Sequence, residues 1–249
     1  MDSGYYAACT ALKTQASALE LAAHNIANVN TTGYRGQTPS FRSMLVASSA
    51  TRQSGWNRLV NEFAVLDGAR LDMAQGNLEH TGNPLDLALE GPGFFAVQTK
   101  GGTLYTRNGN FRMSASGQLV TSAGDPLLGA SGPINLPSGE VSISPDGTVS
   151  VGGAVAGKLR VVSFDAKTQL TPAGGSHYSA PPAGTLSATN SLGHQGMVRQ
   201  GMLESSNVNP VTAMVGLISA QRQAEMVERA MTAFYSDFNR IAADELPRI

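Results

Sequence analysis

The chain has 249 residues, a formal net charge of −1 at pH 7 and a single cysteine. The near-neutral charge speaks against nucleic acid and anionic membranes as partners, and one cysteine excludes an intrachain disulfide. The charged fraction of 14% is below the roughly 25% of ordinary domains, which is consistent with a surface that is buried against other chains.

Residues 3–28 are predicted to form a long helix. Their apolar and small residues recur at alternating steps of four and three, which is the spacing of a coiled-coil seam. This seam consists of Tyr5, Cys9, Leu12, Ala16, Leu19, Ala23 and Ile26. The asparagines Asn25, Asn28 and Asn30, which tolerate a left-handed C-cap, and then Gly33 mark the end of the helix. The alternative is an ordinary surface helix on a globular core.

The segment 34–75 is predicted to be an extended connector with one or two short strands. Ser, Thr, Arg and Gly dominate residues 36–55, and apolar residues follow Trp56, the only tryptophan. We expect Trp56 to be packed rather than to bind a ligand.

From about Gly76 the sequence changes to short β units separated by turn residues. The expected strands are Phe94–Val97, Leu104–Arg107, Phe111–Met113, Gln118–Thr121, Val141–Ser144, Thr148–Val151, Leu159–Phe164 and Met197–Leu203. Asn108 and Gly109 form a strong hairpin signal, which predicts that the flanking strands pair, and residues 145–147 (PDG) predict a tight turn. Residues 171–195 are rich in Pro, Gly and Ser and are expected to form a surface loop. The whole region is typical of a compact, mainly antiparallel β domain.

Residues 210–242 are predicted to form a second long helix, roughly 48 Å in length. Asn209 can cap this helix, and Pro210 can occupy its first position, where a missing N–H costs nothing. Gln221 and Glu228 interrupt its apolar stripe. The stripe comprises Met214, Leu217/Ile218, Ala224, Met231, Phe234/Tyr235, Phe238 and Ile241.

These elements predict an α+β fold. We expect the N- and C-terminal helices to pair as a coiled-coil stem, with a central, mainly antiparallel β domain inserted between them. The expected parts are a terminal helical assembly domain of residues 1–34 and 205–249, an extended connector at 35–75 and a β-rich domain at 76–204.

The sequence offers no recognisable catalytic or cofactor site. The four histidines lack zinc-site spacing, and the chain contains neither a phosphate-binding loop, a dinucleotide-binding glycine motif nor a nucleophile elbow. Asp86 is expected to be a turn or ladder residue rather than an acid or base. The N-terminal helix has one lysine and neither Trp nor Phe, which speaks against direct lipid binding. We therefore predict no enzyme activity, no cofactor and no metal; we also expect no Sec-type signal peptide.

Three segments resemble the bacterial flagellar rod and hook family. The first is residues 23–34 (AHNIANVNTTGY). The second is residues 81–97 (TGNPLDLALEGPGFFAV), followed by 105–111 (YTRNGNF) and 117–120 (GQLV). The third is residues 205–211 (SSNVNPV), which lead to Gln221, Arg222 and Glu225. These segments occur in the family's order. His24, where the family usually has Asn, and Ala224, where an aromatic residue is common, depart from its pattern.

Within that family the length resembles the short rod members. The residues around Pro210 and the start of the chain resemble the proximal rod type, with the distal rod type as the alternative. The resemblance implies a structural subunit of the drive shaft that leaves the cytoplasm through the flagellar type III export apparatus. Such a subunit assembles helically with other rod proteins and copies of itself in the periplasm-spanning rod. A soluble dimeric module whose β domain binds a ligand is a further alternative.

The helical seams and the family's asparagine-rich segment give the residues that we expect to take part in assembly. They are Tyr5, Leu12, Leu19, Asn25, Ile26, Asn28, Met214, Leu217, Ile218, Gln221, Met231, Phe234 and Phe238.

Overall fold

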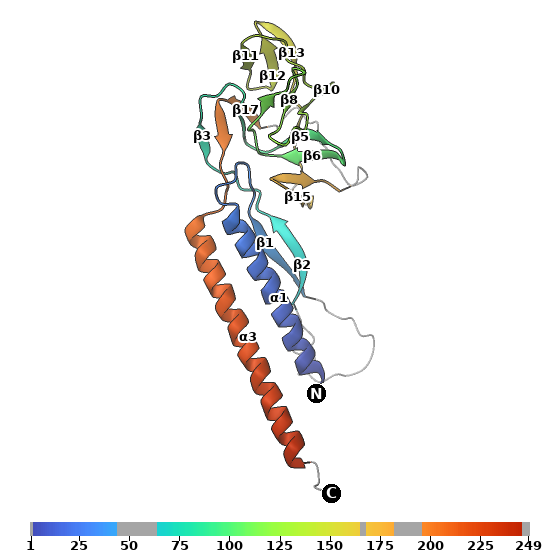
Figure 1. Ribbon diagram of the computed structural model, residues 1–249, viewed down its shortest axis with the longest axis vertical. Helices are drawn as coiled ribbons and strands as arrows, with labels where there is room; N and C mark the ends of the chain where they lie inside the picture. The colour runs from blue at the N-terminus through green and yellow to red at the C-terminus, as the bar shows by residue number, and fades with distance from the viewer. Residues whose placement is uncertain (1, 44–63, 165–167, 182–195, 246–249) are drawn as a thin grey trace. The chain divides into compact units, whose positions relative to one another are not determined.

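The computed structural model describes residues 2–43, 64–164, 168–181 and 196–245 (Figure 1). The chain forms two compact units. The helical unit comprises residues 1–27, 37–70 and 209–249, and the β unit comprises residues 28–36 and 71–208. The expectation for Trp56 lies outside the described residues.

The two long helices of the helical unit lie side by side (Figure 1). They are α1, Asp2–Ala27, and α3, Pro210–Glu245. The predicted α+β fold with packed terminal helices is thereby confirmed. The predicted cap of α3 is also confirmed, since Asn209 Oδ1 accepts hydrogen bonds from the amides of Val211 at 3.0 Å and Thr212 at 3.2 Å. Neither of these helices carries a stretch apolar enough to span a membrane.

Two strands complete the described part of the helical unit. β1, Gln37–Ser43, pairs with β2, Ala64–Leu71, whose last residue belongs to the β unit. The connector predicted from the sequence therefore contains two paired strands. β1 also packs against α1.

The β unit contains a five-stranded antiparallel sheet in the order β14-β5-β6-β16-β15. Its strands, in that order, are Val161–Val162, Phe94–Thr99, Gly102–Thr106, His177–Ser179 and Thr171–Gly174. A three-stranded sheet follows the order β11-β12-β13, with bounds Val141–Ile143, Thr148–Val151 and Ala154–Lys158. The expected tight turn at residues 145–147 joins β11 to β12, and the Gly147 amide donates to Ser144 O at 2.9 Å.

The remaining strands of the β unit form antiparallel pairs. Two of these pairs join residues far apart in the sequence: β4, Leu87–Glu90, with β17, Met197–Gln200, and β3, Leu78–His80, with β18, Met202–Glu204. The other two are local: β7, Arg112–Met113, with β8, Leu119–Val120, and β9, Leu128–Gly129, with β10, Gly132–Pro133. The long-range pairs return the chain to the side of residues 78–90 just before α3 begins.

Two apolar clusters form the core of the β unit. The larger is built around Leu87, Phe95, Leu119 and Val149, which are all fully buried. The smaller contains Phe94 and Tyr178, whose rings meet edge to face at 5.7 Å. Edge-to-face aromatic pairs add to the stabilisation from burial, so the contact between Phe94 of β5 and Tyr178 of β16 stabilises the sheet.

The hairpin predicted at Asn108 and Gly109 was wrong. β6 pairs with β5 and β16, and β7 pairs with β8, so the strands on either side of these residues do not pair with each other. Gly109 is needed for a close backbone approach instead. The Leu87 amide donates to Gly109 O at 3.0 Å, and a Cβ on Gly109 would lie 1.5 Å from Leu87 O.

The surface loop predicted for residues 171–195 was wrong over its first part. β15 and β16 form a hairpin there, and Tyr178 is buried with 2% of its surface exposed. Glycines at 174 and 175 and Ser176 take positive φ angles and make the turn, which explains why a composition typical of loops also suits this hairpin. Residues 182–195 lie outside the described part.

Candidate assembly surface and the ion-pair junction of the β unit

One face of α1 packs against α3. Gln15 fixes that face, because its Nε2 donates to the Ala220 carbonyl at 2.9 Å and to Gln223 Oε1 at 3.0 Å. Polar side chains within a helix seam specify register. The half-buried residues of α1 that share the face of Gln15 are Leu12, Leu19, Ala22 and Ile26.

The matching face of α3 is more regular than the sequence indicated. Its half-buried residues recur at steps of four and three, as in a heptad seam. They are Ala213, Leu217, Ala220, Ala224, Val227 and Met231. Gln221 and Glu228 are exposed beside this seam and do not interrupt it.

The contact is rotated slightly from the predicted one on both helices. Ala16 and Ala23 of α1 are exposed, and Gln15 and Ala22 take the corresponding places. Small residues stand on several faces of α1, so the heptad pattern alone did not fix the phase. On α3, Leu217 is half buried, whereas its neighbour Ile218 is 51% exposed.

A second face of α1 packs on β1 through Asn25. Its Nδ2 donates to Gln37 O at 2.7 Å, and its Oδ1 accepts from the Gln37 amide at 2.8 Å. Gln37 is buried. Asn25 therefore joins the last turn of α1 to the first residue of β1, a role that its prediction as an assembly residue did not include.

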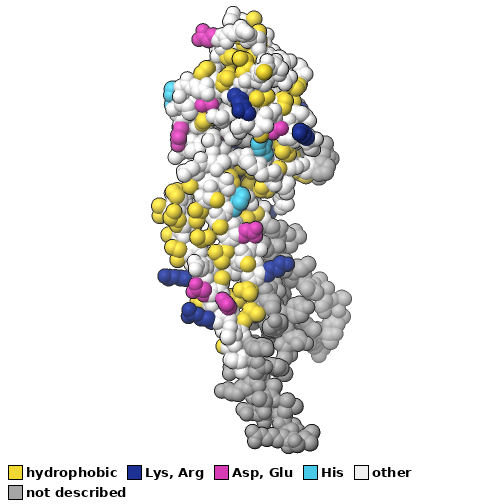
Figure 2. Space-filling model, viewed as in Figure 1, with side chains coloured by type: hydrophobic (Ala, Val, Ile, Leu, Met, Phe, Trp, Pro, Cys, Tyr) yellow, Lys and Arg dark blue, Asp and Glu magenta, His cyan; other side chains and the backbone are white. Residues whose placement is uncertain are grey.

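The face of α3 that lies opposite its seam carries exposed apolar side chains. Val211, Met214, Val215 and Ile218, here called the outer stripe, have exposed fractions of 67%, 52%, 58% and 51%. Their steps of three and four place them on one face of the first two turns. Figure 2 shows hydrophobic side chains gathered on the helical unit near the start of α3, with charged side chains further along. Contiguous exposed apolar residues of this kind mark interaction surfaces.

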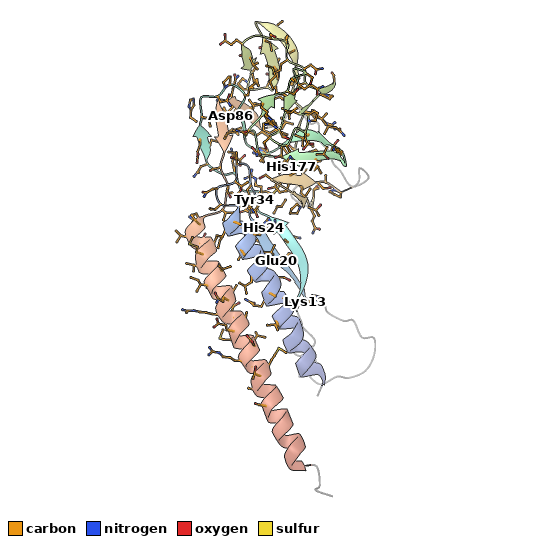
Figure 3. The ribbon with its side chains drawn as sticks, viewed as in Figure 1. Lys13, Glu20, His24, Tyr34, Asp86 and His177 are labelled. Carbon is orange, nitrogen blue, oxygen red and sulfur yellow. The ribbon has the colours of Figure 1, made fainter. Side chains whose placement is uncertain are left out.

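The exposed face of α1 has a different character. Lys13, Glu20 and His24 lie along it (Figure 3), together with the small residues Ala16 and Ala23. Small side chains let a neighbouring helix approach closely. The helical unit thus presents one face with large apolar groups and another with small and charged groups.

The remaining predicted assembly residues are distributed as follows. Asn28 is half buried and belongs to the β unit. The side chains of Tyr5, Phe234 and Phe238 lie outside the described residues. The assembly role of the whole set stays a prediction.

In the β unit, Glu204 lies between two arginines. Its Oε1 is 2.9 Å from Arg35 Nη2 and its Oε2 is 3.0 Å from Arg107 Nη1. The three residues are almost fully buried, with exposed fractions of 1%, 1% and 3% for Arg35, Glu204 and Arg107. Burial lowers the pKa of Arg107 to about 10, although the Glu204 carboxylate opposes that change. Buried charges persist in proteins when they are paired and hydrogen-bonded.

Each arginine also binds backbone and aromatic groups. Arg107 Nη1 and Nη2 donate to the carbonyls of Leu89 at 3.1 Å and Gly91 at 2.6 Å, and its guanidinium lies 5.3 Å from the centre of the Phe94 ring. Arg35 Nη1 donates to the Ala74 carbonyl. The Arg35 amide donates to Tyr178 Oη at 2.8 Å, and burial raises the pKa of Tyr178 to about 12.

Asn207 adds a second set of bonds beside Glu204. Its Oδ1 accepts from the Gly36 amide at 2.7 Å, and its Nδ2 donates to the carbonyls of Asp72 at 3.0 Å and Ala74 at 2.9 Å. We call Arg35, Arg107, Glu204 and Asn207 the junction. Sequence reasoning missed it, although Arg107 and Asn207 stand in segments that carry the family resemblance.

The described residues provide no reactive constellation. No group of His, Cys, Asp and Glu among them could hold a metal ion. Asp86 is buried and accepts hydrogen bonds from Thr81, Asn83 and Asn110. It also forms a β-bridge with Asn110, so the prediction of a turn or ladder residue is confirmed.

Three protein-family models match successive parts of the chain. They are "Flagella basal body rod protein" at residues 6–35, "Flagellar hook protein FlgE/F/G D1 domain" at residues 88–151 and "Flagellar basal body rod FlgEFG protein C-terminal" at residues 199–239. The matches include most of α1, the part of the β unit from β4 to β12, and most of α3.

Curated proteins are similar to the chain over nearly its whole length. The flagellar basal-body rod protein FlgF of Caulobacter vibrioides is 33% identical, covering 100% of both chains. FlgF of Salmonella typhimurium is 34% identical over 99% of this chain and 98% of its own. The rod protein FlgG of Agrobacterium fabrum is 34% identical over 90% of this chain and 92% of its own.

Proposed function

Because the chain belongs to the FlgF/FlgG family of flagellar basal-body rod proteins, we propose that it is a subunit of the proximal part of the flagellar rod. Its general function follows from the family: it is a structural protein of the basal-body rod and not an enzyme. What remains for proposal is its position in the rod, its contacts and its route there.

The observation that carries the proximal position is the end-to-end match with FlgF relatives. The chain and FlgF of Caulobacter vibrioides cover each other completely, whereas the FlgG relative of Agrobacterium fabrum leaves about a tenth of this chain unmatched. Since the identities are nearly equal, the distal rod is the second candidate. The match of lengths favours the proximal position.

The partners that we propose are other rod proteins and further copies of this chain. The outer stripe of α3 supports this, because covering its four exposed apolar side chains with a neighbouring subunit lowers the free energy. The exposed alanines of α1 offer a complementary surface of small residues. Contacts between two different faces repeat from subunit to subunit and generate a helical assembly when the rotation does not close.

We further propose that the subunit reaches the periplasm-spanning rod through the flagellar type III export apparatus. The family resemblance supports this route. A test is secretion from cells that carry the export apparatus and from cells that lack it. The proposal requires the chain to stay inside the cells that lack it.

The position can be tested with purified basal bodies. Antibody labelling of the chain should decorate the membrane-proximal segment of the rod, and cells without the gene should make no rod beyond that point. Labelling of the distal segment would support the second candidate. A concentration-independent dimer that never joins rod proteins would instead support a soluble binding module.

A further inference from the structure

The chain passes between its two units at four points. These are the bonds after residues 27, 36, 70 and 208. On the side of the β unit, three short segments adjoin them: residues 28–36 follow α1, residues 71–76 begin with the last residue of β2, and residues 204–208 precede α3. If these segments made no contact with one another, nothing in them would bring the end of α1 close to the start of α3.

Hydrogen bonds join all three segments inside the β unit. Glu204 O accepts from the Gly33 amide at 2.7 Å, and its Oε1 accepts from the Gly76 amide at 2.9 Å. Asn207 bonds Gly36 on one side and Asp72 on the other. Side chains of the segment before α3 thus hold the backbone of both other segments.

The β core positions this set of bonds. Arg107 follows β6 directly. Its guanidinium contacts Glu204, the Phe94 ring, one carbonyl within β4 and the Gly91 carbonyl just after β4. Tyr178 of β16 accepts a hydrogen bond from the Arg35 amide. Opening the set would leave buried charges without partners, which is strongly unfavourable. The segments are therefore held closed as long as the β unit is folded.

We propose that the junction clamps the segments after α1 and before α3 together and thereby promotes the pairing of the two helices within a single subunit. Gly33 lies six residues after the end of α1, and Asn207 lies three residues before the start of α3. Short tethers on a fixed anchor raise the effective concentration of the two partners.

The junction can influence helix pairing because the contact between α1 and α3 buries few large apolar side chains. On the described faces of α1 and α3 the seam residues are half buried, and several are alanines. Helices gain most of their stability in proteins from packing of an apolar face, and this face buries little. By holding the adjoining segments together, the clamp adds to the stability that the seam gives to the helix pair.

The test is amide hydrogen exchange in the full chain, comparing Asn207→Ala with Glu90→Gln as the control. Glu90 pairs with Arg199 at 2.7 Å, and both side chains are 45% exposed, so its replacement leaves the junction intact. In Asn207→Ala we expect the Gly36 amide and the amides of α1 and α3 to exchange about tenfold faster. The amides of β5 and β6 should keep their protection.

Several outcomes would overturn the proposal. One is unchanged protection of both helices in Asn207→Ala although Gly36 exchanges faster; another is unchanged protection of Gly36 itself. Glu204→Gln provides a second test. Whether it opens only the junction or unfolds the β unit, the helices must lose protection, and helices that stay protected would contradict the clamp. These results do not depend on where the subunit sits in the rod.

Discussion

Glu204 Oε2 lies 3.0 Å from Arg107 Nη1, and the two side chains are 1% and 4% exposed although 97 residues separate them in the sequence. The pair ties the end of β6 to the strand that precedes α3. Because both groups are removed from water, each depends on the other for its charge to be tolerated. Most of our predictions for stability follow from this arrangement.

Replacing Glu204 with glutamine should strongly destabilise the β unit. The amide keeps the shape of the side chain but leaves Arg35 and Arg107 buried without a counter-charge, a loss of about 3–5 kcal/mol. The exposed pair of Glu90 and Arg199 provides the control, since Glu90→Gln should cost about 1 kcal/mol or less. Hydrogen exchange of the β5 and β6 amides across a urea series measures both changes. Equal losses in the two variants would contradict a special role of the buried pair.

Tyr178 should make the β unit sensitive to alkaline pH. Its pKa is raised to about 12 in the folded chain, so the folded state holds the phenol proton between pH 10 and 12 while the unfolded state releases it. Stability from Tyr178 is thus complete below pH 10 and falls as the pH rises to 12. The pKa of Arg107 is lowered from 12.5 to about 10. Between these two values the unfolded state holds more protons than the folded state, so the contribution of Arg107 to stability rises with pH.

Since the two groups act in opposite directions, the comparison with Tyr178→Phe isolates the tyrosine. At neutral pH the variant should be less stable by about 1–3 kcal/mol, because the buried Arg35 amide loses its acceptor. That deficit should shrink between pH 10 and 12 by an amount on the order of 1–3 kcal/mol. Unfolding free energies of both chains at several pH values measure the difference. A deficit that is constant with pH would rule out a raised pKa for Tyr178.

The long helices could be predicted from the sequence because their signals are local. Heptad spacing and the Asn209 cap lie within a few residues of the structure they specify. The phase of the helix contact was harder. Alanine is found at both buried and exposed positions of helices, so the sequence does not show which of Ala16 and Ala22 faces the partner helix. Which of them makes contact depends on α3.

The junction could not be predicted because its parts are remote in the sequence. Arg35, Arg107 and Glu204 each look like an ordinary charged surface residue beside a turn, and single-sequence patterns contain no signal that joins them. The Asn108–Gly109 error has a related origin. Hairpin statistics describe a local turn, whereas Gly109 is required by the distant backbone of Leu87.

Substitution of Gly109 should therefore be costly for reasons of space. In Gly109→Ala the new Cβ would lie 1.5 Å from Leu87 O, so the two segments must separate and strain their 3.0 Å backbone hydrogen bond. We expect a loss of about 2–4 kcal/mol. In Gly157→Ala the added Cβ meets no atom within 4 Å, so this control should change stability by about 0.5 kcal/mol or less. Similar losses in both variants would contradict the close approach of Gly109 to Leu87 as the cause.

Ile218 separates assembly from folding. Its side chain is 51% exposed in the outer stripe, so Ile218→Asp should leave the stability of the isolated chain within about 0.5 kcal/mol of the original. The charge should prevent a neighbour from covering the stripe and abolish rod assembly and motility. Ser219→Asp places the same charge on the next, exposed residue outside the stripe and should preserve swimming.

Leu19→Asp should abolish assembly through a different route, because Leu19 is half buried in the seam of α1 and its loss separates the helices within the subunit. Motility of complemented cells and circular dichroism of the purified chains distinguish the three cases. Normal swimming with Ile218→Asp would exclude the outer stripe from the rod contact.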